Sequence, residues 1–218
     1  MSDNRISIAV IKRLPRYYRY LGDLLDKGIT RISSKELSDR MGITASQIRQ
    51  DLNNFGSFGQ QGYGYNVESL YMEIKQILGL DKVYKLVLIG AGNFGQTLVN
   101  YTNFSKRGFH FVALFDTDNA IIGSNVNDIP ILDADNLEAF LSENSIDIAV
   151  LTVPASAAEK VGHTLAKSDI KGIWNFSNTD LSMPERIIVE NVRLTDSLMT
   201  LSYRVNEDEI LHRASGTK

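Results

Sequence analysis

Three glycines with the spacing G-x-G-x-x-G, namely Gly90, Gly92 and Gly95, have the clearest chemical use of any residues in this sequence. An apolar run typical of a strand buried on both faces precedes them, and an apolar helical pattern follows directly. In that setting the first glycine permits a tight turn, the second lets a pyrophosphate approach the backbone, and the third lets helix and strand pack closely. The free N–H groups of the helix start favour phosphate oxygens. The pattern therefore predicts a dinucleotide site.

Asp116 stands 21 residues after Gly95, at the end of a second apolar run, residues 111–116. A carboxylate at this place can accept hydrogen bonds from the adenosine ribose hydroxyls, and it repels a 2′-phosphate. The combination favours an NAD-type cofactor over a tight strand–helix turn without a ligand. The residues expected around the adenosine and pyrophosphate are Gly90, Ala91, Gly92, Asn93, Phe94, Gly95 and Asp116.

Apolar strands and amphipathic helices alternate through the rest of the chain, which predicts a doubly wound parallel sheet. We expect strands at residues 129–132, 147–153, 171–175 and 188–192, and helices at 93–104, 134–143 and 155–167. Ligands on such sheets lie beyond the carboxyl ends of the strands. The further residues at those ends are Val153, Pro154, Asn175 and Phe176. Taken alone, Pro154 and Phe176 are better explained by core packing.

Charge is distributed unevenly along the 218 residues. Residues 1–80 carry 11 Lys and Arg against 8 Asp and Glu, whereas residues 81–218 carry 12 against 18. A basic N-terminal part on an acidic chain indicates contact with a polyanion, although charge alone fits a solvated helix face better.

Composition excludes several classes of protein. The absence of cysteine rules out disulfides, a thiol nucleophile and a cysteine-based metal site. With only three histidines we expect no metal site of any kind. There is no run of about 18 apolar residues and no apolar leader, so we expect a cytoplasmic protein.

Two helix-start signals follow one another closely in the basic part. Residues 33–36 (Ser-Ser-Lys-Glu) and 44–47 (Thr-Ala-Ser-Gln) both fit a capping box, and Gly42-Ile43 separates the two short helices. This is the pattern of a helix-turn-helix. The second helix buries Ile48 and Leu52 and otherwise presents Arg, Asn and Gln side chains, which suit base edges and phosphates.

Residues 55–65 alternate four glycines with aromatic residues, a pattern typical of a hairpin. A hairpin directly after a recognition helix is the wing of a winged helix. The first helix, residues 6–27, turns its arginines away from an apolar stripe. The residues expected to contact DNA are Arg13, Arg16, Ser46, Gln47, Arg49, Gln50, Asn53, Gln61 and Tyr63.

The order of these parts resembles the Rex family of redox-sensing transcriptional repressors, over residues 8 to 205. The matching segments are Arg13-Leu14 with residues 17–20, Ser33-Ser34 with Glu36-Leu37, residues 47–49 with Asp51-Leu52, Phe55-Gly56 with residues 62–65, residues 90–95, Thr152-Val153-Pro154 and residues 172–176. The resemblance implies an α/β protein: an N-terminal winged helix-turn-helix domain (1–80), a Rossmann dinucleotide-binding domain (81–193) and a C-terminal domain-swapped helix with a tail (194–218).

The resemblance also implies a function. A homodimer would bind palindromic operator DNA, would hold NADH or NAD⁺, and would leave the DNA when NADH binds. Val153 to Asn175 would frame the nicotinamide half, and Thr152 and Tyr101 would also belong to the cofactor site. An apolar helix expected at residues 195–205 would cross to the partner subunit, with a charged tail from Glu207 onward, although packing on its own domain remains open.

The family's switch residues match this chain in part. Arg19 matches an arginine of the winged domain, and Tyr101, expected two turns into the helix after the glycine loop, matches a tyrosine. The family's aspartate near the start of the swapped helix is Arg193 here, and Asp196 lies one turn later as a candidate substitute. A basic wing residue common in the family is Gln61.

Two other functions stay open. A small NAD-dependent oxidoreductase with an accessory winged helix needs a proton donor or acceptor at the hydride, and His110, His163 and His212 are poorly positioned candidates. A winged helix used only for protein contacts, beside a structural Rossmann domain, would not need the polar recognition helix.

Overall fold

The computed structural model describes residues 6–56, 58–60, 63–101 and 104–215. The chain divides into two compact units, residues 1–82 and 83–218, and we describe each unit by itself.

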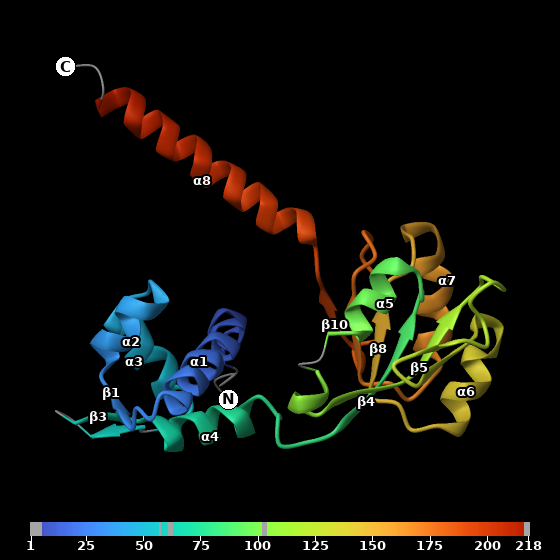
Figure 1. Ribbon diagram of the computed structural model, residues 1–218, viewed down its shortest axis with the longest axis horizontal. Helices are drawn as coiled ribbons and strands as arrows, with labels where there is room; N and C mark the ends of the chain where they lie inside the picture. Colours follow the sequence, from blue (N-terminus) through green and yellow to red (C-terminus); the bar gives the residue numbers. More distant parts are fainter. Residues whose placement is uncertain (1–5, 57, 61–62, 102–103, 216–218) are drawn as a thin grey trace. The chain divides into compact units, whose positions relative to one another are not determined.

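The first unit contains four helices and a three-stranded antiparallel sheet of order β1-β3-β2 among its described residues (Figure 1). Helices α2 and α3 pack together, and α1 packs along α4. This is a winged helix-turn-helix, as expected. The elements are α1 (Ile8–Asp26), β1 (Arg31–Ile32), α2 (Ser34–Met41), α3 (Ala45–Asn53), β2 (Gly59–Gln60), β3 (Gly64–Asn66) and α4 (Val67–Ile77).

Helix α2 begins and ends where its sequence requires. The Ser33 hydroxyl accepts a hydrogen bond from the Glu36 amide at 3.1 Å, and the Glu36 carboxylate accepts one from the Ser33 amide at 2.8 Å. Gly42 ends the helix with φ = 66°, a conformation that favours glycine. Thr44 caps α3 in the same manner, but the Gln47 side chain does not complete that box.

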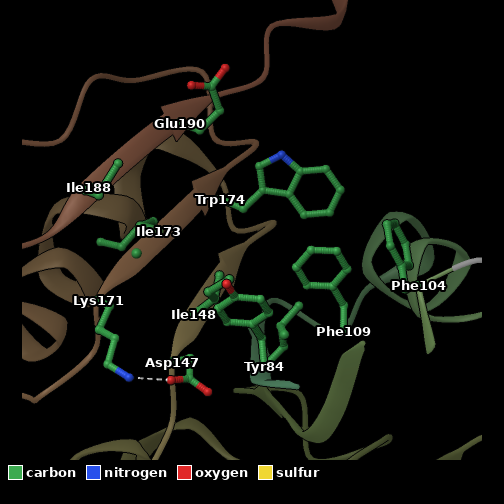
Figure 2. A pocket seen from close by; sticks show the side chains of 12 residues that line it. Tyr84, Phe104, Phe109, Asp147, Ile148, Lys171, Ile173, Trp174, Ile188 and Glu190 are labelled. Atoms are coloured by element: carbon green, nitrogen blue, oxygen red, sulfur yellow. Dashed lines mark hydrogen bonds and ion pairs between the residues drawn. The ribbon is translucent and has the colours of Figure 1, made fainter. Parts of the chain in front are cut away.

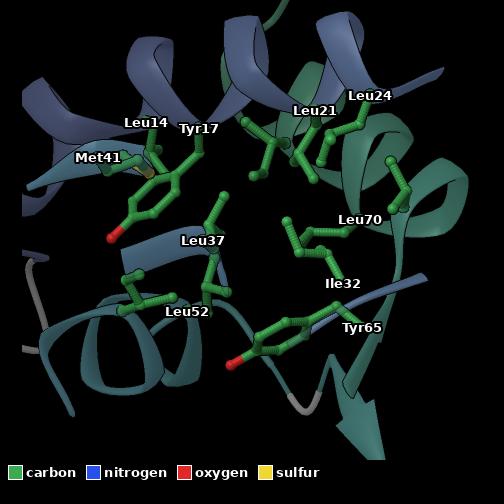
Figure 3. Close-up of a cluster of buried hydrophobic side chains, with 13 residues drawn as sticks. Leu14, Tyr17, Leu21, Leu24, Ile32, Leu37, Met41, Leu52, Tyr65 and Leu70 are labelled. Atoms are coloured by element: carbon green, nitrogen blue, oxygen red, sulfur yellow. The ribbon is translucent and has the colours of Figure 1, made fainter. Parts of the chain in front are cut away.

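One apolar core holds the first unit together (Figure 3). Tyr17 and Leu21 of α1 meet Leu37 of α2, Leu52 of α3 and Leu70 of α4, and all five are at most 1% exposed. Because every helix contributes to this core, the direction of α3 is fixed by packing from three sides.

The second unit is built on a seven-stranded sheet of order β10-β9-β8-β4-β5-β7-β6. All neighbouring strands are parallel except β6 and β7. The six parallel strands follow the order 3-2-1-4-5-6 of a Rossmann fold, and the order reverses between β4 and β8. The strands are β4 (Tyr84–Ile89), β5 (Phe109–Asp116), β6 (Asn125–Val126), β7 (Ile129–Asp133), β8 (Ile148–Leu151), β9 (Gly172–Asn175) and β10 (Ile188–Asn191).

The two faces of this sheet are covered unequally. Apolar residues of α6 and α7 belong to the core on one face, whereas α5, which has only seven residues, supplies Val99 to the other. The connection from β5 to β7 contains a hairpin strand in place of a helix. The helices are α5 (Asn93–Val99), α6 (Leu137–Glu143), α7 (Ala155–Ala166) and α8 (Leu194–Ser215), with short 3₁₀ turns at Ser105–Arg107 and Ala134–Asn136.

Two predicted helix lengths are wrong. Helix α5 ends at Val99, five residues before the expected end, so Tyr101 lies beyond the helix. Helix α5 stops at Asn100, and asparagine is a residue type whose side chain can compete with a helix for backbone hydrogen bonds. Helix α8 continues to Ser215, through the segment expected to be a charged tail, because Glu, Leu, Arg and Ala in that segment favour helix.

Candidate cofactor site and nucleic-acid interface

The glycine loop lies between β4 and α5, at the point where the strand order reverses. Gly90 has φ = 102°, and a Cβ there would lie 2.8 Å from the Thr152 carbonyl carbon. A Cβ on Gly95 would overlap the Gly90 carbonyl oxygen, whereas a Cβ on Gly92 would meet nothing within 4 Å. The first and third glycines are therefore required by the fold, and the second leaves open space in front of the backbone.

Neighbouring side chains hold the loop in shape. The Thr152 hydroxyl donates to the Gly90 carbonyl at 2.8 Å, and the Gln96 amide donates to the Ala91 carbonyl at 2.8 Å. Gly92 occupies the N-cap of α5 and offers no side chain to the first amides of the helix. Asn93 and Phe94, the first two residues of α5, are exposed. The free helix N-terminus suits phosphate oxygens.

Asp116 lies at the carboxyl end of β5, next to the glycine-bearing strand β4. Its Oδ1 accepts hydrogen bonds from the amides of Thr117 (2.7 Å) and Asp118 (3.0 Å). Among the described residues Oδ2 has no hydrogen-bond partner, so it can accept from a ribose hydroxyl. The backbone bonds fix the direction in which the carboxylate points.

The ends of β8 and β9 complete this edge of the sheet. Val153 is partly buried and Pro154 is exposed, just before α7. The Phe176 ring lies edge-on to that of Phe94, with centroids 5.3 Å apart. Asn175 differs from its expected use: it is fully buried, and its amide is saturated within the domain.

The three expected switch residues are distributed over both units. Arg19 is exposed on α1, with its guanidinium 5.7 Å from the Tyr20 ring centroid. Tyr101 is 57% exposed after α5, and its ring is tilted against that of Phe104. Asp196 lies in the first turn of α8 and is exposed.

Helix α3 presents a polar face to solvent. Four of the predicted contact residues are exposed and follow helical spacing, which places them on one side: Ser46, Arg49, Gln50 and Asn53. The Arg49 guanidinium rests 3.0 Å from the Ser34 hydroxyl of α2. Such a row of donors and acceptors on the second helix of a helix-turn-helix suits the major groove.

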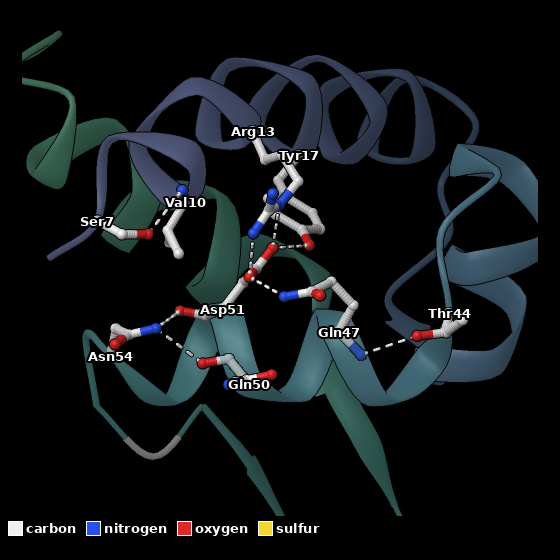
Figure 4. A network of polar contacts seen from close by, with 9 residues as sticks. All are labelled: Ser7, Val10, Arg13, Tyr17, Thr44, Gln47, Gln50, Asp51 and Asn54. Atoms are coloured by element: carbon white, nitrogen blue, oxygen red, sulfur yellow. Dashed lines mark hydrogen bonds and ion pairs between the residues drawn. The ribbon is translucent and has the colours of Figure 1, made fainter.

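A buried carboxylate, named above only as part of a matching segment and not as a site residue, joins that helix to α1 (Figure 4). Asp51 is 0% exposed and accepts from Arg13 through two bonds of 2.6 and 2.7 Å. The Tyr17 hydroxyl and the Gln47 amide each donate to it at 2.8 Å. Arg13 and Gln47, expected at the DNA, are therefore bonded inside the domain. Arg16, also on α1, is exposed and donates to the Met41 carbonyl at 2.7 Å.

These contacts set the charge states of the cluster. Burial raises the pKa of Asp51, but hydrogen bonds from Arg13, Gln47 and Tyr17 outweigh burial and bring that pKa below its ordinary value. The hydrogen bond to Asp51 raises the pKa of Arg13. Burial, followed by the bond to Asp51, raises the pKa of Tyr17. At neutral pH the cluster is an ion pair with a neutral phenol.

The wing adds a residue that the sequence analysis missed. The Arg31 guanidinium of β1 lies 5.9 Å from the ring centroid of Tyr63, which is 69% exposed, and donates to the Tyr63 carbonyl at 3.3 Å. The register that pairs β1 with β3 brings them together, and short-range pattern does not reveal it. Gln61 lies outside the described residues.

An apolar groove of about 460 Å³ lies elsewhere on the sheet (Figure 2). Rings of Tyr84, Phe109 and Trp174 and the side chains of Ile148 and Ile188 line it. None of the expected cofactor residues does. Leu86, Tyr84 and Ile148, which line the groove, also belong to the core cluster to which the seven-residue α5 contributes Val99.

The described residues form neither a metal-binding group nor a membrane-spanning helix. No group of three or more His, Asp or Glu side chains is arranged to hold a metal ion. Of the helices described, none has the length and apolar character needed to cross a membrane.

Comparison with known proteins gives consistent matches for both units. Residues 5–53 match a family model described as a putative DNA-binding protein N-terminus, and residues 81–179 match one described as a CoA binding domain. A redox-sensing transcriptional repressor Rex of Clostridioides difficile strain 630 is 58% identical over 207 residues, covering 95% of this chain and 99% of that relative. The Rex of Clostridium botulinum strain Hall is 57% identical over 204 residues, covering 94% and 97%.

Solved structures match along the full length as well. The crystal structure of RSP in complex with β-NAD⁺ and operator DNA is 51% identical, with a TM-score of 0.89 over 98% of this chain and 99% of that chain. RSP in complex with β-NADH is 49% identical, with a TM-score of 0.89 over 96% and 98%. RSP is described as a Rex-family repressor. With a winged helix, a Rossmann unit and relatives of this identity over nearly its whole length, the chain belongs to the Rex family of redox-sensing transcriptional repressors.

Proposed function

We propose that this protein is a transcriptional repressor that binds operator DNA as a homodimer and leaves it when NADH occupies the Rossmann unit. The observation that carries the proposal is the presence, in one chain, of an exposed polar α3 face and an open glycine loop with Asp116 beside it. Full-length relatives named redox-sensing repressors support the same function. Operator DNA as partner assigns the protein to the cytoplasm.

The DNA contacts follow from exposure and chemistry. We assign base and phosphate contacts to Ser46, Arg49, Gln50 and Asn53, with Arg16 and Arg31 as cations for the backbone. Gln61 and Tyr63 of the wing belong to the same interface. We assign Arg13 and Gln47 to holding α3 in place through Asp51, to which both donate hydrogen bonds.

The cofactor contacts are assigned to the glycine loop and the neighbouring strand ends. Pyrophosphate lies against Gly92 and the first amides of α5, and the adenosine ribose bonds to Asp116. The nicotinamide lies toward Thr152, Val153 and Phe176. We assign Tyr101 and Arg19 to sensing whether the nicotinamide ring is oxidised or reduced, together with the carboxylate of Asp196 in the first turn of α8.

The dimer is assigned to α8. Leu194, Leu198, Leu201 and Val205 repeat at helical spacing and are 52–65% exposed, and Met199 and Tyr203 are exposed as well. A helix with apolar side chains on more than one side is stable in water only when other surfaces bury it. The apolar groove over β8 and β9 is a second surface of this kind.

One experiment tests the proposal directly. Fluorescence anisotropy of a labelled palindromic operator, at fixed protein, should fall as NADH is added. It should stay high with NAD⁺, which should compete with NADH. If anisotropy is unchanged at saturating NADH, the proposal is wrong.

Coenzyme A and NADPH, used as ligands in the same titration, test whether the Rossmann unit is selective for NADH. Coenzyme A shares the adenosine and pyrophosphate but carries a ribose phosphate that Asp116 should repel. NADPH should fail for the same reason. Steady oxidation of NADH with simple ketones or aldehydes would instead favour the oxidoreductase alternative.

A further inference from the structure

Four polar side chains join the end of β9 to the start of α8 by hydrogen bonds. The Asn175 amide donates to the Asn191 side-chain oxygen at 2.8 Å. Asn191 donates to Asp180 Oδ1 at 3.3 Å, and the Arg193 guanidinium donates to the same oxygen at 2.6 Å. We call these four residues the polar relay. They come from β9, the loop after it, β10 and the residue before α8.

One end of the polar relay lies at the cofactor edge of the sheet. Phe176 directly follows Asn175, and its ring contacts that of Phe94 in the first turn of α5. Asn175 cannot adjust alone, because its amide also donates to the Thr179 carbonyl and its oxygen accepts from the Ser177 amide and hydroxyl. These bonds tie Asn175 to the loop after it, so a shift of the backbone at Phe176 would move Asn175 and that loop together.

The other end of the polar relay lies at the root of α8. Arg193 immediately precedes Leu194, the first residue of the helix, and its carbonyl accepts from the Asp196 amide at 3.2 Å. The ion pair with Asp180 thus restrains the residue through which α8 leaves the Rossmann unit. The family resemblance leads one to expect an aspartate at position 193. An aspartate could not form this ion pair with Asp180, so the restraint on the start of α8 depends on the arginine of this chain.

The Asp180–Arg193 pair is suited to opening and closing. The Asp180 side chain is 79% exposed and that of Arg193 is 31% exposed. Exposed pairs of this kind contribute little to folding stability. A small change in loop position can therefore break the pair without unfolding the domain.

We propose that the polar relay couples occupancy of the cofactor site to the direction of α8, with the Asp180–Arg193 ion pair as its releasable step. Asp180 and Arg193 are positioning residues: they touch neither DNA nor cofactor, and they act through the root of the dimer helix. This inference rests on the proposed function, because it needs a cofactor-dependent repressor whose dimer is held by α8. A ligand shifts the relay only by binding its two states with different affinity.

The test measures coupling, defined as operator Kd at saturating NADH divided by operator Kd without cofactor. In Asp180→Asn and in Arg193→Gln, coupling should fall about threefold or more, within the range produced by residues of a coupling network. Melting temperature and NADH affinity without DNA should match the unmodified protein. Glu138→Gln is the control and should keep full coupling, because it removes the carboxylate of an exposed ion pair between Glu138 of α6 and Lys167, the residue after α7.

The double variant Asp180→Asn with Arg193→Gln shows whether the two residues act together through their ion pair or contribute to coupling independently. If the pair acts as a unit, the double variant loses no more coupling than either single variant. Full coupling in both single variants, an equal loss in Glu138→Gln, or strictly additive losses would each overturn the polar relay. Absence of any NADH effect in the unmodified protein would instead overturn the proposed function.

Discussion

At the glycine loop, added side chains meet different neighbours at positions 92 and 95. A Cβ on Gly92 has no atom within 4 Å, so Gly92→Val should leave the melting temperature nearly unchanged. The valine fills the space assigned to pyrophosphate, so NADH binding should be lost. Calorimetric titration with NADH and a thermal melt measure both effects.

Gly95→Ala gives the contrasting case. Its methyl group would overlap the Gly90 carbonyl and lie 2.9 Å from Leu88 Cδ2, so the free energy of unfolding should fall by about 1–3 kcal/mol.

Normal NADH binding by the Gly92→Val variant would show that the pyrophosphate does not lie at Gly92.

The sequence predicted the glycine loop well because its three positions are local and each has one physical reason. The cofactor contact expected of Asn175 remains a prediction. That residue stands at the end of a strand, as ligand contacts do, but its amide is bonded within the domain. Arg13 is a similar case, since its partner Asp51 lies 38 residues away. Side-chain direction depends on partners distant in sequence, and spacing alone does not reveal them.

At the scale of elements, Asp51 joins α3 to α1, and this contact should depend on pH. Hydrogen bonds lower the folded pKa of Asp51 below the unfolded value of about 3.9. A lowered pKa means that the carboxylate stabilises the first unit above the unfolded pKa, and that this is lost as pH falls through the folded pKa. Thermal melts of the full chain below about pH 4 should therefore show the first unit losing stability.

Asp51→Asn isolates this contribution. At neutral pH the variant should be less stable by about 3 kcal/mol or more, because Arg13 loses a buried partner. Below pH 4 the difference from the unmodified protein should shrink. Glu36, whose pKa is also lowered by its cap bonds to Ser33, contributes equally to both proteins and cancels in the comparison. A constant difference across this pH range would contradict the role of Asp51.

Arg49→Ala tests the exposed face of α3. The Arg49 side chain is exposed and donates a hydrogen bond to the Ser34 hydroxyl. Its removal should therefore leave folding unaffected. Operator binding should weaken by about 1–3 kcal/mol if the guanidinium contacts a base. If it contacts only phosphate, binding to all duplexes should weaken alike and the salt slope should fall. Equal affinity on every duplex would remove α3 from the interface.

The sequence predicts a helix and its ends where apolar periodicity and capping residues agree. It does not predict the C-terminal ends of α5 and α8, where these signals disagree. The capping box at Ser33 and the glycine at position 42 fixed α2 from sequence alone. The end of α5 was missed because apolar residues continue past Asn100, although the helix stops there. The end of α8 was missed because charged residues suggest a tail, although many of them favour helix.

At the scale of the whole molecule, the exposed apolar residues of α8 lead to a prediction about assembly. Removing residues 194–218 takes away Leu194, Leu198, Leu201 and Val205, which are all more than half exposed, and leaves the Rossmann core intact. The truncated protein should fold and should be a monomer. Removing only residues 206–218 keeps these four side chains and should preserve the dimer. Light scattering coupled to gel filtration distinguishes the two outcomes.

Operator affinity should depend on whether the protein is a monomer or a dimer, and not on how many residues are removed. A monomer reads one half-site, whereas a two-fold dimer reads a palindrome and gains avidity, so truncation at 194 should weaken operator binding about 100-fold or more. The shorter truncation should bind nearly as well as the full chain.

In the intact dimer, linkage requires that operator DNA weaken NADH binding by the same factor by which NADH weakens operator binding. NADH fluorescence titrations with and without operator measure one factor, and anisotropy measures the other. Unequal factors would mean that a further state or ligand takes part, and a dimer formed by the protein lacking 194–218 would show that α8 is not what holds the subunits together.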